Sequence, residues 1–368
     1  MNYVKDYEKL VNKINDIDEP VAWFECLEEI GNQAALLIKK MERAGLDEMI
    51  DTALGILPMV RTKNPQVNAI SAITLGALIE NGMPPHKIEE EVIEEFINIL
   101  ELSKSFIEIV EERAPLVDEE EIEDMDENNG GYWVDEYYVS PELAQEFWLE
   151  ENRYVQAYQA MDQFVCCIVT IFSADLKLAH KYNNDELNEL VYYHDLSFIR
   201  MLLNILSDEK FLVIHPDTKQ GFQLTINGIS DNFQLHTLLA DALAYDGNGP
   251  DWGIPARRPS ESIINVVNGK GPQESEEVSK GVCNLYNWTV LKCKDMDSAD
   301  LGEWIWNEGI PSDIEKWKNT RVIVLGPPSY TRTWNTGKSI PHLKPEIKIE
   351  KILNQNEVSE LIDTIKNS

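Results

Sequence analysis

The sequence predicts an α+β protein, with an all-helical, multi-helix module over residues 1–210 and a mixed α+β module over residues 211–368. Three properties change near residue 210. The first part carries 44 acidic and 16 basic side chains, whereas the second carries 21 and 16. The second part, although shorter, holds ten of the 17 prolines and twelve of the 19 glycines. It also holds six of the nine tryptophans, and two modules of different structure account for all three changes together.

Helical spacing of apolar residues predicts a succession of helices in the first module, over residues 2–16, 20–45, 47–60, 65–82 and 86–113. The second begins at Pro20, a favoured first-turn residue, and ends near Gly45. The fourth begins at Asn64-Pro65, where the asparagine can cap the helix and the proline can take its first position.

A long apolar stripe follows Ser140-Pro141. Apolar residues recur three or four positions apart from Phe147 to Ala179, which predicts one helical stripe, and a further helix is predicted over residues 185–206. Helices this apolar must be buried between other helices, so the first module is expected to be a helical bundle.

Strand patterns dominate the second module. Residues 211–214 and 221–226 predict two strands joined by a turn, and Asp231 with Gln234 predicts the start of a helix through a pattern like a capping box. Further strands are predicted over 284–293, 321–325 and 347–350, followed by a closing helix over 356–366. The strands do not alternate regularly with helices, which favours an α+β arrangement.

The net charge of −33 bears on the choice of partners. Such a field repels nucleic acid phosphates and anionic membranes within about 8 Å at physiological salt. We therefore expect no nucleic acid and no membrane as partners, and a basic protein surface as the natural partner of the first module.

The compartment predicted for the chain is the cytoplasm. Its first residues lack the apolar segment of a signal peptide, and the longest apolar stretch, Phe164–Phe172, is far shorter than the roughly 20 residues that span a bilayer. Five cysteines, without a Cys-x-x-Cys pair, indicate neither a disulfide scaffold nor a zinc ribbon.

An acidic loop is predicted near residues 115–139, because eight of the ten residues from Asp118 to Glu127 are acidic and repel one another. The candidate partner-binding residues are two acidic triplets, Glu119, Glu120 and Glu121 in this loop and Glu89, Glu90 and Glu91 at the start of a helix.

The same loop carries an imperfect calcium-binding pattern. Oxygen-bearing side chains take positions 1, 3, 5 and 12 of an EF-hand-like loop, supplied by Asp124, Asp126, Asn128 and Asp135. Asparagine replaces the usual glycine at position 6, and aspartate replaces the bidentate glutamate at position 12. A solvated loop without metal is the alternative.

Candidate catalytic residues are confined to the second module. His215, His236, Asp241 and Arg332 fall at predicted strand ends, on the predicted helix or in a polar loop, where they could line a pocket. Histidine on a leucine-rich helix can equally be a hydrogen-bonded core residue. The sequence has no complete P-loop, GxGxxG or GxSxG motif, and no cofactor is predicted.

The sequence thus leads to two main hypotheses of function. The first is a soluble acidic interaction protein, such as an inhibitor or immunity-type protein that blocks a basic, nucleic-acid-acting toxin at its phosphate site. The second is an enzyme or small-molecule-binding protein with a pocket in the second module. A scaffold component of a larger assembly is a third possibility.

Overall fold

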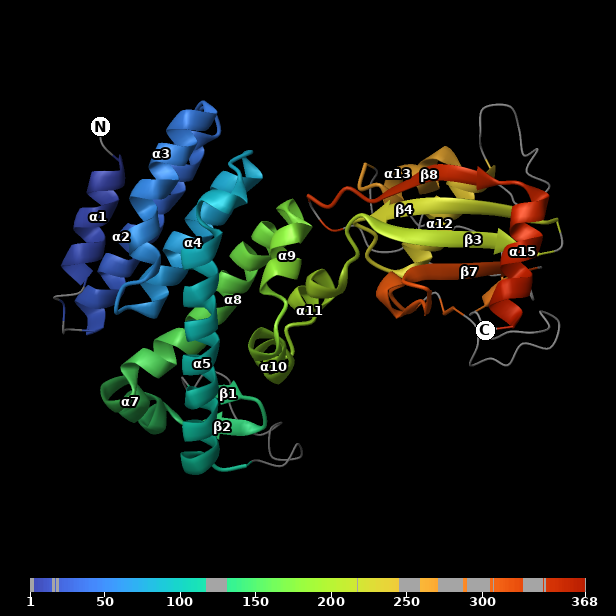
Figure 1. Ribbon diagram of the computed structural model, residues 1–368. Coiled ribbons are helices and arrows are strands. Elements are labelled where there is room, and N and C mark those ends of the chain that lie inside the picture. Colours follow the sequence, from blue (N-terminus) through green and yellow to red (C-terminus); the bar gives the residue numbers. More distant parts are fainter. Residues whose placement is uncertain are drawn as a thin grey trace. The chain divides into compact units, whose positions relative to one another are not determined.

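The computed structural model describes residues 3–14, 17, 20–116, 131–216, 218–244, 259–270, 287–289, 305–306, 308–326, 340 and 342–367. The chain forms two compact units, Met1–Arg200 and Met201–Ser368. The first is helical and the second holds a mixed sheet with helices on both faces (Figure 1), which confirms the predicted α+β class.

The helical unit begins with five α-helices and two short 3-10 turns. Their bounds are α1 (Tyr3–Ile14), α2 (Pro20–Met41), α3 (Leu46–Ile56), η1 (Leu57–Val60), α4 (Pro65–Glu80), η2 (Pro85–Lys87) and α5 (Glu89–Arg113). The predicted cap of α4 is confirmed, because the Asn64 side chain accepts a hydrogen bond from the backbone N–H of Val67.

The region predicted as one helical stripe is instead three helices, α7 (Pro141–Glu150), α8 (Asn152–Ala174) and α9 (Leu176–Tyr182). The chain leaves helical geometry at Glu151 and again at Asp175, whose side chain caps α9. The predicted helix over 185–206 is likewise two helices, α10 (Asp185–Tyr193) and α11 (Ser197–Asn204). An apolar stripe continues across such breaks because each segment faces the same core.

Helix α8 is the central helix of this unit and packs against α4 and α5, with Phe96 of α5 stacked on Phe164. It is long and apolar enough to span a membrane, yet half of its most apolar window is buried inside the unit. Packing against α4 and α5 thus explains its composition, as in the core helix of a soluble protein.

A β-hairpin that the sequence did not predict follows the acidic tract. Its strands, β1 (Tyr132–Val134) and β2 (Tyr137–Val139), pair antiparallel around a two-residue turn. Asp135 in this turn has φ +50°, a conformation that aspartate tolerates better than most residues. Val134 and Val139 are buried in a cluster with Phe106 of α5 and Phe147 of α7.

The second unit is built on a sheet with the strand order β5-β7-β3-β4-β8. Strands β3 (Glu209–His215) and β4 (Gln220–Asn227) form the predicted central hairpin. The strand β7 (Thr320–Gly326) runs parallel to β3, and β8 (Glu346–Leu353) pairs antiparallel with β4. The short strands β5 (Asn287–Thr289) and β6 (Lys316–Trp317) both pair with β7.

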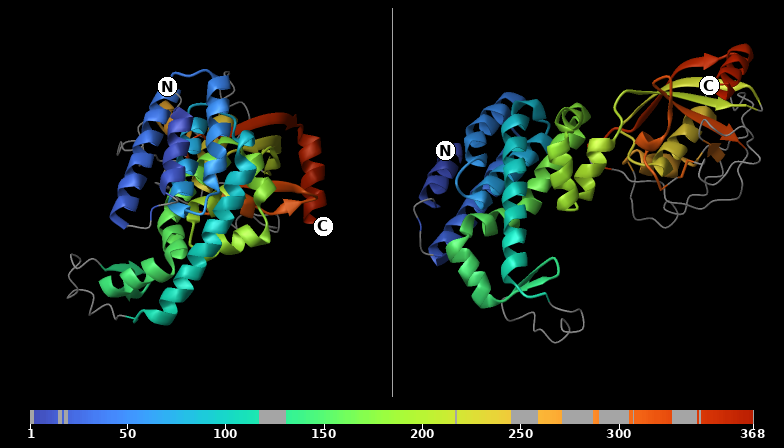
Figure 2. Two further views of the ribbon diagram at one scale, coloured as in Figure 1. Left: turned by 90° about the vertical axis from the view of Figure 1, so that its left-hand side faces the viewer. Right: turned by 60° about the horizontal axis from the view of Figure 1, so that its bottom comes forward.

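Helices cover the two faces of the sheet unequally. Helices α12 (Asn232–Ala244) and α13 (Glu261–Val267) lie on one face and α15 (Gln355–Lys366) lies across one end of the other, as Figures 1 and 2 show. Side chains alternate accordingly: Phe211 and Val213 join the core beneath α12, whereas Leu212 and Ile214 join the core beneath α15.

Candidate functional site

A group of carboxylates gathers in the helical unit where α5, the turn of the β1–β2 hairpin and the end of α10 come together. We call this region the acidic face. Its four carboxylates are Glu101, Glu108 and Glu111 of α5 and Asp135 of the hairpin turn. It also includes Tyr193 of α10 and Lys104 of α5. The α5 residues follow the helical intervals of three and four, so they lie along one side of that helix.

Tyr193 marks the centre of the acidic face. Its side chain is 39% exposed, and its pKa is raised, first by partial burial and then by the negative charges of Glu111, Glu108 and Asp135. The Lys104 ammonium lies 5.2 Å from the centroid of the Tyr193 ring and 4.0 Å from a carboxylate oxygen of Glu189. Lys104 therefore already interacts with Tyr193 and Glu189 and pairs with none of the four carboxylates of the acidic face among the described residues.

The next residue, His194, fastens α10 to α5. Its Nε2 lies 2.9 Å from the carbonyl oxygen of Leu100 and donates a hydrogen bond to it. Burial lowers the pKa of His194, while this hydrogen bond and the charge of Asp135 act in the opposite direction. The contact keeps Tyr193 beside the α5 carboxylates.

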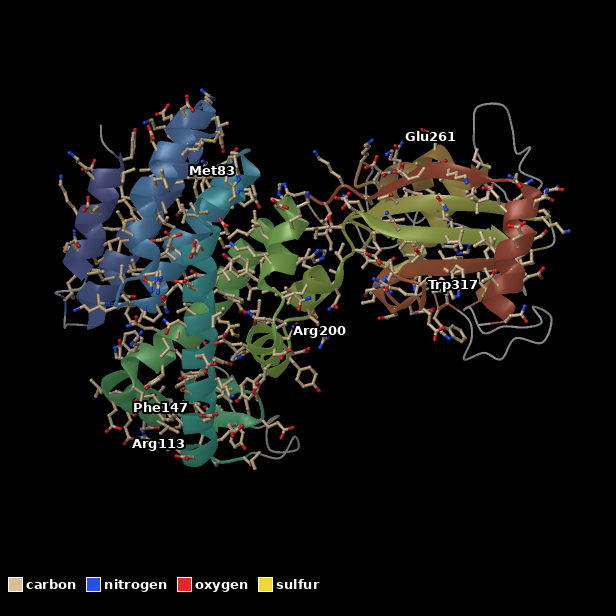
Figure 3. All side chains as sticks on the ribbon, in the orientation of Figure 1. Met83, Arg113, Phe147, Arg200, Glu261 and Trp317 are labelled. Atoms are coloured by element: carbon tan, nitrogen blue, oxygen red, sulfur yellow. The ribbon has the colours of Figure 1, made fainter. Side chains whose placement is uncertain are left out.

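The four carboxylates of the acidic face, Glu101, Glu108, Glu111 and Asp135, form no ion pair with any residue that the structure describes. Elsewhere on the same unit carboxylates are paired. Arg113, labelled with Phe147 in Figure 3, lies 2.9 Å from Glu146 and 3.2 Å from Glu150. The acidic face is thus negative, partly aromatic and open, which are the properties that attract lysine and arginine side chains.

The predicted acidic triplets differ in what the structure says of them. Glu89 forms an ion pair with Lys181, since its carboxylate lies 3.3 Å from the lysine ammonium, and its side chain is only 12% exposed. Glu90 and Glu91 are exposed, and all three occupy the first turn of α5, where negative charge stabilises the helix dipole. The other triplet, Glu119, Glu120 and Glu121, lies outside the described residues.

Of the four residues in the predicted calcium site, the structure describes only one. Asp135 lies in the hairpin turn, and its negative charge contributes to the raised pKa values of Tyr193 and Tyr158. Asp124, Asp126 and Asn128 lie outside the described residues. Within the described part of the chain no group of three His, Cys, Asp or Glu residues is arranged to hold a metal ion.

Three of the four predicted catalytic residues lie on the α12 side of the sheet. His215 ends β3 and is buried, with its Nδ1 2.9 Å from the hydroxyl of Thr218, so it braces the β3–β4 turn. His236 is buried within α12, and Asp241 lies five residues further along the same helix. Arg332 lies outside the described residues.

The sequence did not single out the acidic face because its members are far apart in the chain. One local signal was present: acidic or basic residues at positions 101, 104, 108 and 111 keep one charged stripe along α5. The proximity of Asp135 and Tyr193 to that stripe depends on the tertiary fold.

No protein-family model, no curated protein and no solved structure matches the chain. What the chain does must therefore be inferred from its own residues.

Proposed function

We propose that the helical unit binds a basic protein and that the acidic face is its contact surface. The observation that carries the proposal is the clustering of Glu108, Glu111 and Asp135 around Tyr193, and of Glu101 near His194, with no ion-pair partner among the described residues. Like charges held together cost free energy in the isolated protein, and a cationic partner would relieve that cost.

The chemistry of the face favours arginine or lysine side chains on the partner. Carboxylates accept hydrogen bonds from guanidinium and ammonium groups, and a tyrosine ring adds cation–π attraction. The large net negative charge would speed encounter with such a partner by roughly 10–10³-fold at low salt.

A concrete form of this function is inhibition of a basic, nucleic-acid-acting protein, in the manner of an immunity protein. Carboxylates of the acidic face would occupy the positions where that protein binds phosphates. We place the protein in the cytoplasm, which suits the free thiols of Cys26, Cys166 and Cys167 in the described region.

The test compares two variants of the full chain that lose four negative charges each. One is Glu101→Gln, Glu108→Gln, Glu111→Gln, Asp135→Asn. Its control changes four exposed glutamates outside the face to glutamine, namely Glu8, Glu25, Glu28 and Glu42. Fluorescently labelled nona-arginine is the first probe, and protein partners recovered from the native host are the second.

The acidic-face variant should bind nona-arginine at least tenfold more weakly than wild type, while the control stays within about threefold. Wild-type affinity should fall as salt rises from 0.05 to 0.5 M, because screening weakens exposed charge pairs. A host protein retained by the control but lost by the acidic-face variant identifies the partner. Equal loss of affinity in both variants would instead assign binding to net charge and refute the acidic face.

A further inference from the structure

Among the residues that the structure describes, the helices leave part of one face of the second unit's sheet uncovered. Helix α15 packs its Val358 and Ile365 against Leu212, Ile214 and Leu353 near one end of the strands. Beyond the helix, β3, β4, β8 and the β6–β7 turn enclose a groove of about 570 Å³. That volume lies within the range of small-molecule sites.

The groove combines apolar walls with polar side chains. Trp317, Leu212 and Leu361 supply the apolar surface. Lys210, Gln223, Thr225, Lys318, Thr320 and Glu350 supply polar groups around them. A few polar groups converging on an apolar wall is the usual composition of a ligand site.

The groove is positively charged, whereas the chain as a whole is strongly negative. Lys210 and Lys318 form no ion pair within 4.0 Å among the residues described in the structure, although Lys210 and Glu350 attract each other at longer range. Glu350, by contrast, lies 2.8 Å from the Lys348 ammonium, and its pKa is lowered by that contact first. The groove thus carries two lysines against one carboxylate that already pairs with Lys348, which makes it a positive site in a chain with 65 acidic and 32 basic residues.

The β6–β7 turn holds Lys318 at the edge of the groove in a costly conformation. Lys318 and Asn319 have φ values of +48° and +63°, which suit glycine or asparagine better than lysine. The Lys318 ammonium lies 4.4 Å from the centroid of the Trp317 ring, whose position Figure 3 labels. Backbone preference does not account for a lysine here, whereas its contact with Trp317 keeps a cation at the edge of the groove.

We infer that this groove binds a small organic anion, a carboxylate or phosphate carried on a flat ring. The anion would contact Lys210 and Lys318, and drawing Lys318 from the indole would free that face of Trp317 for the ring. Thr320 and Gln223 would hydrogen-bond the remaining polar atoms, whereas the Thr225 hydroxyl already donates to Glu350. The site is independent of the acidic face and lies on the sheet face opposite His215 and α12.

The experiment titrates the full chain with three probes by ligand-observed NMR and calorimetry. Phenyl phosphate carries ring and charge, inorganic phosphate carries charge alone, and benzyl alcohol carries the ring alone. Phenyl phosphate should bind at least tenfold more tightly than either of the others. Failure of phenyl phosphate to bind at millimolar concentration, or binding no tighter than inorganic phosphate, would overturn the inference.

Variants locate the site. Lys210→Gln and Lys318→Gln should each weaken phenyl phosphate binding about threefold or more, and Trp317→Leu about tenfold. Lys270→Gln removes one charge from an exposed lysine of the same unit outside the groove and should leave the affinity unchanged. Circular dichroism checks that each variant is folded. Equal affinity in the Lys210, Lys318 and Lys270 variants would place the anion elsewhere and refute the assignment.

Discussion

The phenol oxygen of Tyr7 on α1 lies 2.9 Å from the hydroxyl oxygen of Ser71 on α4, inside the core of the helical unit. Ser71 also donates its one hydroxyl hydrogen to the carbonyl oxygen of Val67 at 2.9 Å. Tyr7 is therefore the donor to Ser71. This buried hydrogen bond joins the first helix of the chain to a helix more than 60 positions later.

Tyr7→Phe removes this hydrogen bond without emptying the ring site. We expect a loss of about 1 kcal/mol in the free energy of unfolding at pH 8, the usual value of one buried hydrogen bond. Chemical denaturation measures it, and Tyr192→Phe, at a ring 74% exposed, is the control with no expected effect.

The same variant predicts a pH dependence. Burial raises the pKa of Tyr7 to about 12 from a reference of 10.0, so the folded state keeps this proton after the unfolded state has lost it. The stabilisation is complete below pH 10 and is lost as pH rises towards 12. The stability advantage of wild type over Tyr7→Phe should shrink over that range and then reverse, because two pKa units correspond to about 2.7 kcal/mol. A difference that stays constant would show that Tyr7 ionises equally in both states.

Glu95 is buried, and its carboxylate accepts hydrogen bonds from the side-chain amides of Asn68 at 2.8 Å and Asn98 at 3.2 Å. Desolvation is the largest influence and raises its pKa, so the charged form is held at a cost. For a raised carboxyl pKa, stabilisation is complete below the unfolded pKa and is lost as pH rises through the folded one. Glutamine does not ionise, so the free energy of unfolding of Glu95→Gln relative to that of wild type should increase between pH 4 and pH 7.

Glu95→Ala serves as the matched variant. It leaves one N–H of the buried Asn68 amide without an acceptor, while the other still donates to the carbonyl oxygen of Thr62, and should cost about 1–3 kcal/mol at both pH values. Thermal denaturation at pH 4 and pH 7 compares the three proteins. A Gln variant that loses stability relative to wild type on going to pH 7 would show that the charge itself stabilises the fold.

Two glycine-to-alanine changes should act in opposite directions. A Cβ on Gly221 of β4 would lie 2.7 Å from Cγ2 of Val358, where α15 approaches the sheet, so Gly221→Ala should cost about 1–3 kcal/mol. A Cβ on Gly31 meets nothing within 4 Å inside α2, so Gly31→Ala should stabilise by about 0.5–1 kcal/mol. Urea denaturation reports both. A neutral Gly221→Ala would show that α15 can move away from the sheet.

Lys318→Gly should separate stability from binding. Glycine adopts φ +48° without strain, so the free energy of unfolding should rise by about 1 kcal/mol. The same change should weaken phenyl phosphate binding in calorimetry, because the groove loses a cation. A variant that gains stability and keeps its affinity would remove Lys318 from the proposed anion site.

Local signals in the sequence predicted helix starts well. Asn64-Pro65 and Ser140-Pro141 both begin helices, and Asp231 accepts a hydrogen bond from the backbone N–H of Gln234. The same signals could have divided the long stripe, since Asp175 caps α9. Apolar periodicity concealed that break because the helices on either side face one core.

Features that depend on tertiary proximity were not predictable in this way. The acidic face joins residues of α5 to Asp135 and Tyr193, and no sequence spacing relates them. In the second unit the sequence pointed to histidines that the fold buries at His215 and His236. The groove opens instead on the opposite face, beside α15, whose Leu361 lines it.

The order of the strands also has a consequence for synthesis of the chain. The β3–β4 hairpin is synthesised about 90 residues before β7, the strand that pairs with β3. Strand β8, which pairs with β4, is synthesised later still. Both edges of the hairpin stay unpaired during that interval, and unpaired edges attract other strands. Folding of the second unit must therefore wait until β7 and β8 have been synthesised, and C-terminal truncation before Glu346 should yield aggregates.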